Sequence, residues 1–213
     1  MSKIKKVVLT GGPCAGKSVL LEALKLEFGE DLLIIPEGAT QLLEVPHEKG
    51  GVGIPGKDVE WSQEWQDKFE EKVIEKQLLD ETLITQMANK RKKPTVIVCD
   101  RGLLDSAAYV SGGRASFLRK FNLDLKTCYR LYDQVIHLNS VATDRPEIYE
   151  QLKATNPNRL FESSARAKEL DEKTFLAWKG HPNHIRVPAG EGIEHKMKIT
   201  FSKIKKLFSS LNA

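Results

Sequence analysis

The sequence predicts an α/β protein in which helices flank a parallel sheet of five strands, and three observations support this. Short apolar runs rich in β-branched residues recur along the chain, and segments with helical periodicity separate them. A glycine-rich loop lies between the first apolar run and the first helical segment. Because strand–helix–strand crossovers are right-handed, the strands are expected to lie parallel with helices on both faces.

The composition describes one globular domain. The chain has 213 residues, of which 40% are hydrophobic and 29% charged, so we expect one core and a single domain over residues 1–213. The net charge of +4 suits an anionic ligand such as a nucleotide, but it is too small to indicate a nucleic-acid partner. The three cysteines lack metal-ligand spacing, and their odd number argues against a disulfide framework, which favours the reducing cytoplasm.

The first strand is predicted over residues 4–9, where Val7, Val8 and Leu9 follow two lysines. This apolar run ends at the glycine loop, so it predicts a core strand rather than a signal peptide or a membrane span. Beyond the loop, apolar residues recur at mostly helical spacing as far as Phe28. A strand, a glycine loop and a helix thus follow one another in the order that a phosphate-binding loop requires.

Four residues of this loop, Gly11, Gly16, Lys17 and Ser18, fit the phosphate-binding (P-loop) pattern G-x-x-x-x-G-K-[S/T]. Glycines let consecutive backbone N–H groups converge on phosphate oxygens, and the following helix adds the positive end of its dipole. Lys17 would bridge the β- and γ-phosphates of ATP or GTP, and the Ser18 hydroxyl would bind Mg²⁺. The alternative is an ordinary glycine turn with an exposed lysine. It does not explain why a strand precedes the loop and a helix follows it. The residues expected to bind the nucleotide are Gly11, Gly12, Pro13, Cys14, Ala15, Gly16, Lys17 and Ser18.

The rest of the chain supplies four more strands and their connecting helices. The strands are predicted at residues 31–36, 94–100, 134–138 and 184–187. Helices are predicted at residues 39–43, 59–90, 103–110, 115–132 in two pieces, 165–178 and 196–211. Asp58 is interpreted as the N-cap of the long helix. Residues 139–157 are polar and are expected to be irregular, apart from a helical turn near Ile148 and Tyr149.

The long helix has one face on which apolar residues recur at four-residue steps, namely Trp61, Trp65, Phe69 and Val73. We expect the three tryptophans of the chain, Trp61, Trp65 and Trp178, in the core rather than in a stacking site. Gln77 and Glu81 continue the same face. Either they point into a pocket, where Gln77 would bind substrate, or the helix edge reaches solvent there.

Asp100 and Arg101 end the third strand, at the sheet edge where ligands of parallel sheets bind. An aspartate after an apolar strand in a P-loop protein usually holds Mg²⁺, so Asp100 is predicted to share the metal with Ser18. The next residue is arginine, which suits phosphate recognition, whereas many ATP-hydrolysing machines have a water-activating glutamate there. The alternative makes Asp100 a helix N-cap and Arg101 part of a structural ion pair.

Two further carboxylates lie near the strand ends. Glu37 could take the proton from a substrate hydroxyl as it attacks the γ-phosphate, or it could be a solvated residue that starts a helix. Asp105, one helical turn after Arg101, could bind substrate hydroxyls, or it could satisfy the helix dipole. Four of the residues predicted to act in catalysis are Lys17, Glu37, Asp100 and Arg101. The residues predicted to bind the substrate are Glu37, Gln77, Arg101 and Asp105.

A polar, lid-like segment is predicted around residues 139–166. An arginine in such a segment could close over the transferring phosphate and exclude water. The candidates are Arg145, Arg159 and Arg166, and a catalytic role is assigned to Arg159. The alternative is that these are ordinary surface arginines.

Several motifs occur together along nearly the whole chain: Gly11 to Ser18, Pro36-Glu37-Gly38-Ala39-Thr40, Cys99-Asp100-Arg101-Gly102 with Asp105 and Tyr109, Tyr132-Asp133, Glu162 with Glu169-Leu170-Asp171, and Trp178-Lys179-Gly180-His181-Pro182. In combination they resemble the small AAA-domain P-loop family. That family includes the ribosylnicotinamide-kinase domain of the bacterial NAD-biosynthesis regulator. It also includes the P-loop domain of the animal translocation-defect proteins, which bind phosphoinositides and GTP.

The resemblance implies a fold similar to that of nucleoside and nucleotide kinases. It also implies that Glu37 and the pair Asp100-Arg101 occupy positions where deoxynucleoside kinases keep an acidic base and an acid–arginine pair. Arg159 is offset by one residue from the arginine that usually precedes Glu162. Glu70 stands where the resemblance leads us to expect glutamine, which indicates a different substrate.

Three functional hypotheses remain open. The first is a Mg²⁺-dependent phosphotransferase that moves the γ-phosphate of ATP or GTP to a small, nucleoside-like hydroxyl acceptor. The second is a nucleotide-dependent binding module for phosphoinositides or a protein partner, and the third is a nucleotide hydrolase. Guanine-switch proteins are excluded because the sequence has no N-K-x-D motif. Ring-forming AAA machines are disfavoured, since the chain is too short for their additional helical domain.

The last predicted helix, residues 196–211, is basic and amphipathic. Its apolar face comprises Met197, Ile204, Leu207, Phe208 and Leu211. A basic amphipathic helix could lie on an anionic membrane. We favour packing against the sheet instead, because the fifth strand needs cover and no other element remains to supply it.

Overall fold

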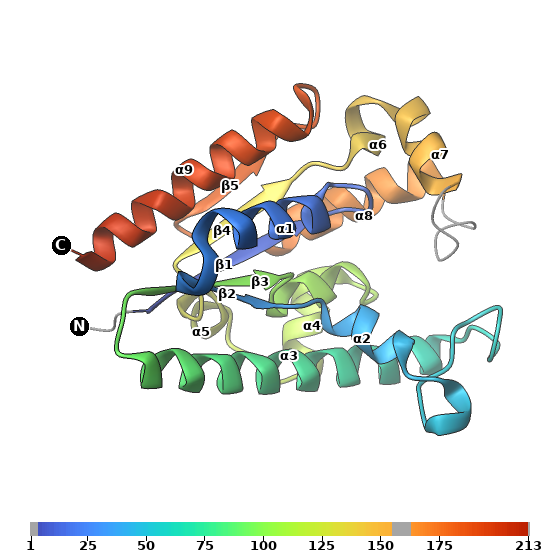
Figure 1. Cartoon of the computed structure of the whole chain (residues 1–213). Coiled ribbons are helices and arrows are strands. Elements are labelled where there is room, and N and C mark those ends of the chain that lie inside the picture. The colour runs from blue at the N-terminus through green and yellow to red at the C-terminus, as the bar shows by residue number, and fades with distance from the viewer. Residues whose placement is uncertain (1–3, 155–162, 213) are drawn as a thin grey trace.

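A parallel sheet forms the centre of the molecule (Figure 1). The computed structural model of the chain describes residues 4–154 and 163–212. Its strands are β1 (Ile4–Gly11), β2 (Leu32–Ile35), β3 (Thr95–Asp100), β4 (Gln134–Leu138) and β5 (His184–Val187). They lie in the order β2-β3-β1-β4-β5, and every pairing is parallel. The predicted five-stranded parallel sheet is therefore confirmed within the described residues.

Helices cover both faces of this sheet (Figure 1). The α-helices are α1 (Lys17–Phe28), α2 (Gly38–Glu44), α3 (Gln63–Arg91), α4 (Gly113–Lys120), α5 (Leu125–Arg130), α6 (Val141–Asp144), α7 (Pro146–Ala154), α8 (Ser164–Ala177) and α9 (Gly192–Asn212). Three short 3₁₀-helices are η1 (Gly29–Asp31), η2 (His47–Lys49) and η3 (Leu103–Ala108). Side chains of α1 and α9 pack on one face, and side chains of α3, α4, α5 and α8 pack on the other.

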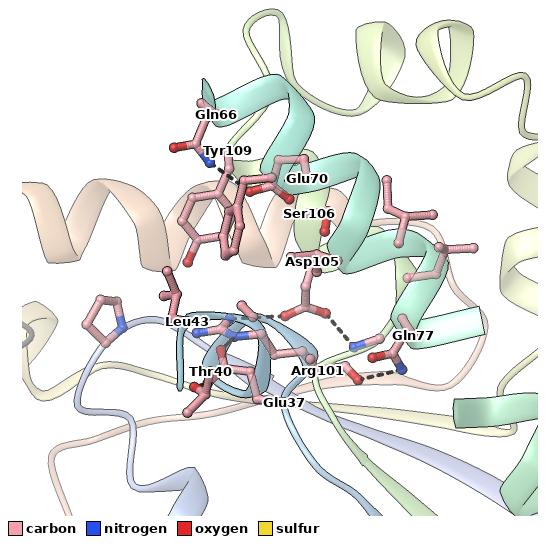
Figure 2. Close-up of a pocket in the computed structure, with 18 of the residues that line it drawn as sticks. Glu37, Thr40, Leu43, Gln66, Glu70, Gln77, Arg101, Asp105, Ser106 and Tyr109 are labelled. Atoms are coloured by element: carbon pink, nitrogen blue, oxygen red, sulfur yellow. Dashed lines mark hydrogen bonds and ion pairs between the residues drawn. The ribbon is translucent and has the colours of Figure 1, made fainter. Parts of the chain in front are cut away.

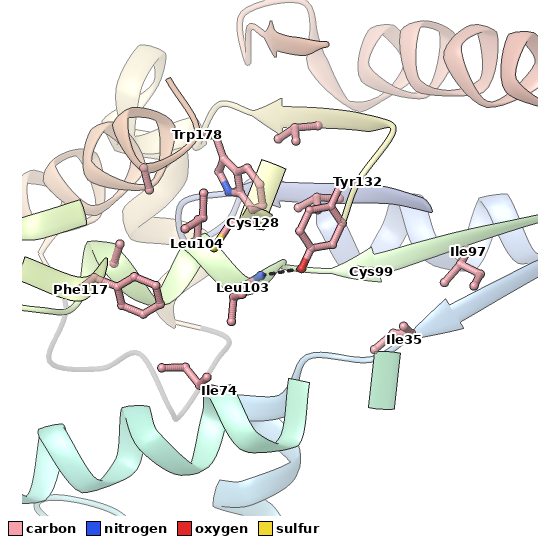
Figure 3. Close-up of a cluster of buried hydrophobic side chains, with 14 of the residues drawn as sticks. Ile35, Ile74, Ile97, Cys99, Leu103, Leu104, Phe117, Cys128, Tyr132 and Trp178 are labelled. Carbon is pink, nitrogen blue, oxygen red and sulfur yellow. Dashed lines mark hydrogen bonds between the residues drawn. The ribbon is translucent and has the colours of Figure 1, made fainter. Parts of the chain in front are cut away.

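The alternation of side chains along β1 explains why both faces need cover. Val7 and Leu9 belong to the apolar cluster under α1 and α9, whereas Val8 belongs to the cluster on the opposite face, and all three are fully buried. Figure 3 shows this second cluster, in which the hydroxyl of Tyr132 accepts a hydrogen bond from the backbone N–H of Leu103 over 3.0 Å. A strand that is apolar on both sides thus fixes the position of the phosphate loop that follows it.

Helix α9 covers the sheet as predicted. The apolar residues of its inner face join the cluster that contains Leu20 and Leu24 of α1, and they are Met197, Ile204, Leu207, Phe208 and Leu211. The helix begins at Gly192, four residues before the predicted start. Among the described helices, none combines the length and the apolarity that a bilayer crossing requires.

The segment after β4 is more regular than predicted. Residues 139–157 were expected to be irregular, but α6 and α7 occupy most of this stretch. The side chain of Ser140 caps α6 by accepting from the N–H of Ala142, and Pro146 occupies the first position of α7, where its missing N–H costs nothing. The fully buried ring of Tyr149 anchors α7 in the core. The helix-start residues Ser140 and Pro146, with the buried ring of Tyr149, explain why this polar segment forms helices.

Two predictions about the start of α3 are wrong. The N-cap is Ser62, whose hydroxyl accepts from the N–H of Trp65, whereas Asp58 closes the preceding loop by accepting from the N–H of Ile54. Trp61 therefore precedes the helix and is 60% exposed instead of lying in the core. Of the other two tryptophans, Trp178 is fully buried, as predicted, and Trp65 is only partly buried.

Candidate active site

The phosphate-loop sequence lies at the carboxyl end of β1 and leads directly into α1. Gly16 adopts φ +88° and Cys14 adopts φ +54°, which are left-handed conformations that let the loop turn tightly into the helix. Lys17 is buried, with Nζ 3.8 Å from Asp100 Oδ1, whereas Ser18 is exposed in the first turn of α1. The loop thus presents backbone N–H groups, a lysine and a hydroxyl at one helix N-terminus.

The peptide between Gly11 and Gly12 is held from both sides. The carbonyl of Gly11 accepts a hydrogen bond from Arg101 Nη1 over 3.2 Å, and the N–H of Gly12 donates to Asp171 Oδ1 over 2.7 Å. Because a peptide unit is planar, these two bonds fix its orientation. Residues far along the chain therefore shape the start of the loop.

Two further carbonyls of the loop are bound by later elements. The hydroxyl of Ser140 donates to the carbonyl of Pro13, and Lys196 Nζ on α9 donates to the carbonyl of Ala15 over 2.9 Å. The same ammonium donates to the carbonyl of Asn139 over 2.6 Å. Since N–H and C=O point in opposite directions across a trans peptide, the next N–H groups face away from these partners. The loop is thereby preorganised to present N–H groups to an anion.

Of the residues that hold the loop, Arg101 was predicted from sequence to be functional, whereas Ser140, Asp171 and Lys196 were not. Asp171 is fully buried in α8 and also accepts from the N–H of Ser140 over 3.1 Å. Burial alone would raise the pKa of Asp171, but the His137 imidazole, whose Nε2 lies 3.2 Å from Oδ1, together with the N–H groups of Gly12 and Ser140, outweighs it and lowers the pKa. An aspartate kept ionised in this way is a strong acceptor for the loop.

Lys196 is also buried, and burial lowers its pKa to about 8 against the opposing charges of Asp171 and Asp144. A sequence signal for it exists, because Lys196, Thr200 and Ile204 are spaced four residues apart on the buried side of α9. A lysine in line with core positions indicates an ammonium with buried partners.

The carboxylate of Asp100 is suited to a metal ion. Its Oδ1 is buried and accepts no hydrogen bond from any described residue, and the Lys17 ammonium is 3.8 Å away. Burial raises the pKa of Asp100, and the positive charge of Lys17 opposes this. An oxygen without a donor, beside the lysine of the phosphate loop, matches the oxygen ligands that Mg²⁺ prefers. Asp100 caps no helix, since the N-cap of η3 is Gly102.

Arg101 is held in an unusual backbone conformation and makes three side-chain interactions. Its φ is +70°, a left-handed value that is uncommon for any residue other than glycine and that occurs preferentially at functional sites. Its Nε donates to Glu37, and its Nη1 donates to the Gly11 carbonyl and, over 3.3 Å, to Asp105. Arg101 therefore connects the phosphate loop to two carboxylates.

Glu37 occupies the N-cap position of α2 and faces Arg101. Burial would raise the pKa of Glu37, but the charges of Arg101 and Lys17, with hydrogen bonds from Arg101 and Thr40, hold it well below its usual range. The Thr40 hydroxyl donates over 2.8 Å. Glu37 is thus ionised at physiological pH and oriented by two donors.

Asp105 accepts four hydrogen bonds. The donors are the Thr10 hydroxyl, Arg101 Nη1, the Gly102 N–H over 3.1 Å and the indole N–H of Trp178 over 2.8 Å. Its carboxylate is 2% exposed and still lines a cavity. These contacts fix the position of η3 relative to β1 and β3.

A cavity of ≈ 350 Å³, which we call the strand-end cavity, opens beside these groups (Figure 2). Its volume lies within the range of small-molecule sites. Pro13 of the phosphate loop lines it together with Glu37, Arg101 and Asp105. The remaining wall is formed mainly by aromatic and polar side chains of α3 and η3, among them Trp65, Gln66, Phe69, Glu70, Gln77, Ser106 and Tyr109. The structure therefore brings Glu37, Gln77, Arg101 and Asp105 together around one cavity.

Gln77 and Glu81 differ in their surroundings, although both are buried. Gln77 lines the strand-end cavity and donates to Glu81 Oε1 over 2.8 Å. Glu81 does not line the cavity. It accepts from Lys6 Nζ over 2.8 Å and from the Tyr132 hydroxyl over 2.6 Å. Of the two residues singled out on this helix face, only Gln77 lines the cavity.

The arginines after β4 have different positions. Arg159 lies outside the described residues. Arg145 donates to the carbonyl of Gly190 over 2.9 Å, and Arg166 forms an ion pair with Glu169 at 2.7 Å. Neither of these two lines the strand-end cavity.

Comparison with known proteins identifies the family. A family model described as an AAA domain matches residues 6–194, which include most of β1, the other four strands and the phosphate loop. A comparison with curated protein sequences found no significant match.

Proposed function

We propose that this chain, which belongs to the AAA-domain family of P-loop proteins, is a Mg²⁺-dependent phosphotransferase with a small, nucleoside-like acceptor. The single observation that carries the proposal is the strand-end cavity, which contains the ionised Glu37 and reaches the phosphate loop at Pro13. A nucleotide hydrolase needs only a water molecule at this position. A cavity of ≈ 350 Å³ with aromatic walls favours an organic acceptor.

The phosphate loop would bind ATP or GTP. Backbone N–H groups of residues 14–18 would hold the phosphates, and Lys17 would bridge the β- and γ-phosphates. Ser18 and Asp100 would hold Mg²⁺, which, when bound, neutralises charge on the phosphate oxygens. The unsatisfied Asp100 Oδ1 supports this assignment.

Glu37 would orient the acceptor hydroxyl. A carboxylate with a lowered pKa is a weak base, so its main contribution would be to accept a hydrogen bond and hold the hydroxyl in line with the γ-phosphate. Little proton transfer is needed early, because phosphoryl transfer passes through a loose transition state. Arg101 would keep Glu37 in place, Gln77 and Asp105 would bind the acceptor, and Arg159 would act as the lid arginine.

The direct test is a panel of nucleosides and ribosides incubated with the protein, Mg²⁺ and either ATP or GTP. We expect one chemical class of acceptor to increase ADP or GDP release above the rate without acceptor. The Lys17→Ala variant should lose this increase and should keep the circular dichroism spectrum of the parent. A panel that leaves product release unchanged would contradict the phosphotransferase proposal.

Glu37→Gln tests the orienting role with a substitution that keeps the shape of the side chain. We expect kcat with a confirmed acceptor to fall by roughly 10²-fold, with little change in the KM of the acceptor, because Gln lacks the charge that holds the side chain against Arg101 and the hydroxyl would be misplaced. An unchanged kcat would mean that Glu37 does not contact the reacting hydroxyl.

A nucleotide-dependent binding module for phosphoinositides is the second candidate. Its strongest sequence support was the basic helix α9, but the apolar face of α9 packs on the sheet and is not available for a membrane. The exposed lysines of that helix could bind lipid headgroups only through charge.

A further inference from the structure

A second carboxylate lies in the wall of the strand-end cavity, away from Glu37. Glu70 on α3 is 4% exposed, and its Oε1 accepts from Gln66 Nε2 over 2.9 Å. Figure 2 shows Glu70 beside Gln66, Ser106 and Tyr109, on the other side of Asp105 from Glu37. The cavity therefore has a reaction end at Glu37 and a far end at Glu70.

Glu70 is a buried acid whose hydrogen-bonding capacity is only partly used. No ion pair to Glu70 is found among the described residues, and the hydrogen bonds it receives come from the side chains of Gln66 and Ser106. Burial raises the pKa of Glu70 to about 7, while both hydrogen bonds and the charges of Arg101 and Lys120 oppose this. Burying such a group is costly, and a carboxylate offers about four acceptor sites, more than these two donors use. Its placement is explained if a ligand donates to it.

The walls next to Glu70 suit a flat ring. The rings of Trp65 and Phe69 are stacked with centroids 4.9 Å apart, and Tyr109 completes the aromatic lining. Aromatic side chains bind planar ligands by offset stacking or edge contacts. A ring held here would direct one edge toward Glu70, while a sugar attached to it would extend toward Glu37.

We propose that Glu70 selects the acceptor, favouring a nucleoside-like molecule whose ring has an amino group on the edge remote from the sugar over an analogue with a carbonyl there. This inference rests on the proposed function and names its substrate class. An ionised carboxylate only accepts hydrogen bonds, and an amino group provides the N–H donors that it needs. A carbonyl oxygen on the ligand is also an acceptor, so its lone pairs would face the lone pairs of the Glu70 carboxylate. In a desolvated cavity such a mismatch is costly.

The protonation state of Glu70 determines whether the amino ligand or the carbonyl analogue is preferred, so the preference should change with pH. Below pH 7 the acid becomes protonated and donates, so it would favour the carbonyl analogue instead. The charged and titratable groups around it are Arg101 after β3, Lys120 on α4, Tyr109 after η3, and the carboxylates Glu37 and Asp105. Burial raises the pKa of Tyr109 above 10 and the pKa of Glu37 is held low, so neither titrates near neutrality.

Two matched pairs of nucleosides test this directly, cytidine with uridine and adenosine with inosine. Calorimetric titration without ATP should show that the amino member of at least one pair binds about 10- to 100-fold more tightly at pH 8. Its affinity should fall about tenfold from pH 8 to pH 6, and that of the carbonyl member should not fall. Equal affinities within both pairs, no binding at all, or a preference independent of pH would overturn the inference.

A substitution and its control complete the test. Glu70→Gln has the same size and cannot titrate, so it should abolish the pH dependence and reduce the amino preference to within about threefold. Glu71→Gln, the adjacent and exposed position, should behave like the parent. A Glu70→Gln protein that keeps both the preference and the pH dependence would overturn the inference. The pH titration of the unmodified protein needs no variant to fold.

Failure of this inference and failure of the proposed function give different results. If amino nucleosides bind with the expected pH dependence but never increase ADP or GDP release, the inference on selectivity holds and the phosphotransferase proposal fails. If product release responds equally to amino and carbonyl acceptors, the phosphotransferase proposal holds and the role of Glu70 is refuted.

Discussion

Three carboxylates near the phosphate loop differ in how fully their hydrogen-bonding capacity is used. Asp105 accepts four hydrogen bonds, and Glu37 accepts from Arg101 and Thr40. Asp100 alone of the three has a buried oxygen that accepts no hydrogen bond from the described residues. Since a buried acceptor without a donor is costly, Asp100 is the carboxylate of the three most suited to a metal ion.

Asp100→Asn tests this assignment, because asparagine keeps the shape and removes the charge. We expect affinity for Mg²⁺-ATP or Mg²⁺-GTP to fall about tenfold or more, while affinity for the metal-free nucleotide stays within about threefold of the parent. Displacement of a fluorescent nucleotide, measured with Mg²⁺ and with EDTA, gives both values. An equal loss under both conditions would show that the residue acts through the fold.

At the scale of elements, α9 both covers the sheet and supports the phosphate loop through the ammonium of Lys196. Lys196→Met keeps the unbranched apolar stem but removes the ammonium, which leaves the carbonyls of Ala15 and Asn139 without their donor, at a cost of about 1–3 kcal/mol. The peptide after Ala15 would then lose its fixed orientation, so nucleotide affinity should fall about tenfold. Lys198→Met, at an exposed position of the same helix, is the control. A folded Lys196→Met protein with unchanged nucleotide affinity would contradict the supporting role.

The two faces of α9 should respond differently to substitution. Leu207→Asp places a charge in the cluster under α1 and should lower the free energy of unfolding by about 2 kcal/mol or more. Replacing Lys203, Lys205 and Lys206 with Gln should change it by less than about 1 kcal/mol, since surface ion pairs such as Lys205–Glu27 contribute little. Urea unfolding measures both. If the lysine variant keeps its stability but loses binding to anionic vesicles at physiological salt, the second candidate function gains the stronger support.

The strand positions and the phosphate loop could be predicted because their signals are local. The apolar runs and the spacing of Gly11, Gly16 and Lys17 can be recognised within a few residues of sequence. Asp171 and Lys196 were missed because their partners lie 159 and 181 residues away along the chain. Trp61 was misplaced because a four-residue step was extended across the N-cap of α3. Periodicity cannot show where a helix begins.

Only part of the site could be predicted, because only some of its residues have a local signal in the sequence. Asp100, Arg101 and Glu37 follow strands, and the ends of parallel strands meet at one edge, so their proximity could be predicted. Glu70 could be singled out only through its resemblance to a family position, because its burial depends on the packing of α3 against η3. The hydrogen bonds that hold the phosphate loop involve α8 and α9, and although the spacing on α9 marks Lys196 as buried, no local pattern shows that its partners lie in the loop.

For the whole molecule, nucleotide binding should stabilise the entire fold. The loop is hydrogen-bonded to Ser140 just before α6, to Asp171 in α8 and to Lys196 in α9. At a nucleotide concentration 100 times Kd, the free energy of unfolding should rise by about 2.7 kcal/mol. For a chain of this size, Tm should rise by about 5–10 °C in a single transition. Differential scanning calorimetry with and without Mg²⁺-nucleotide measures the shift. Two transitions, only one of them shifted, would show that the loop and α9 unfold separately.

The bond between Ala15 and Lys196 has a consequence for the order of events when the protein is made. The loop leaves the ribosome before the residues that hold it, and Lys196 is synthesised 181 residues after Ala15. Until α9 has emerged and docked, the Ala15 carbonyl lacks its ammonium donor, and closing so long a loop of chain is slow. Nascent chains should therefore acquire full nucleotide affinity only after α9 has emerged, so that nucleotide capture reports the docking of this helix on the loop.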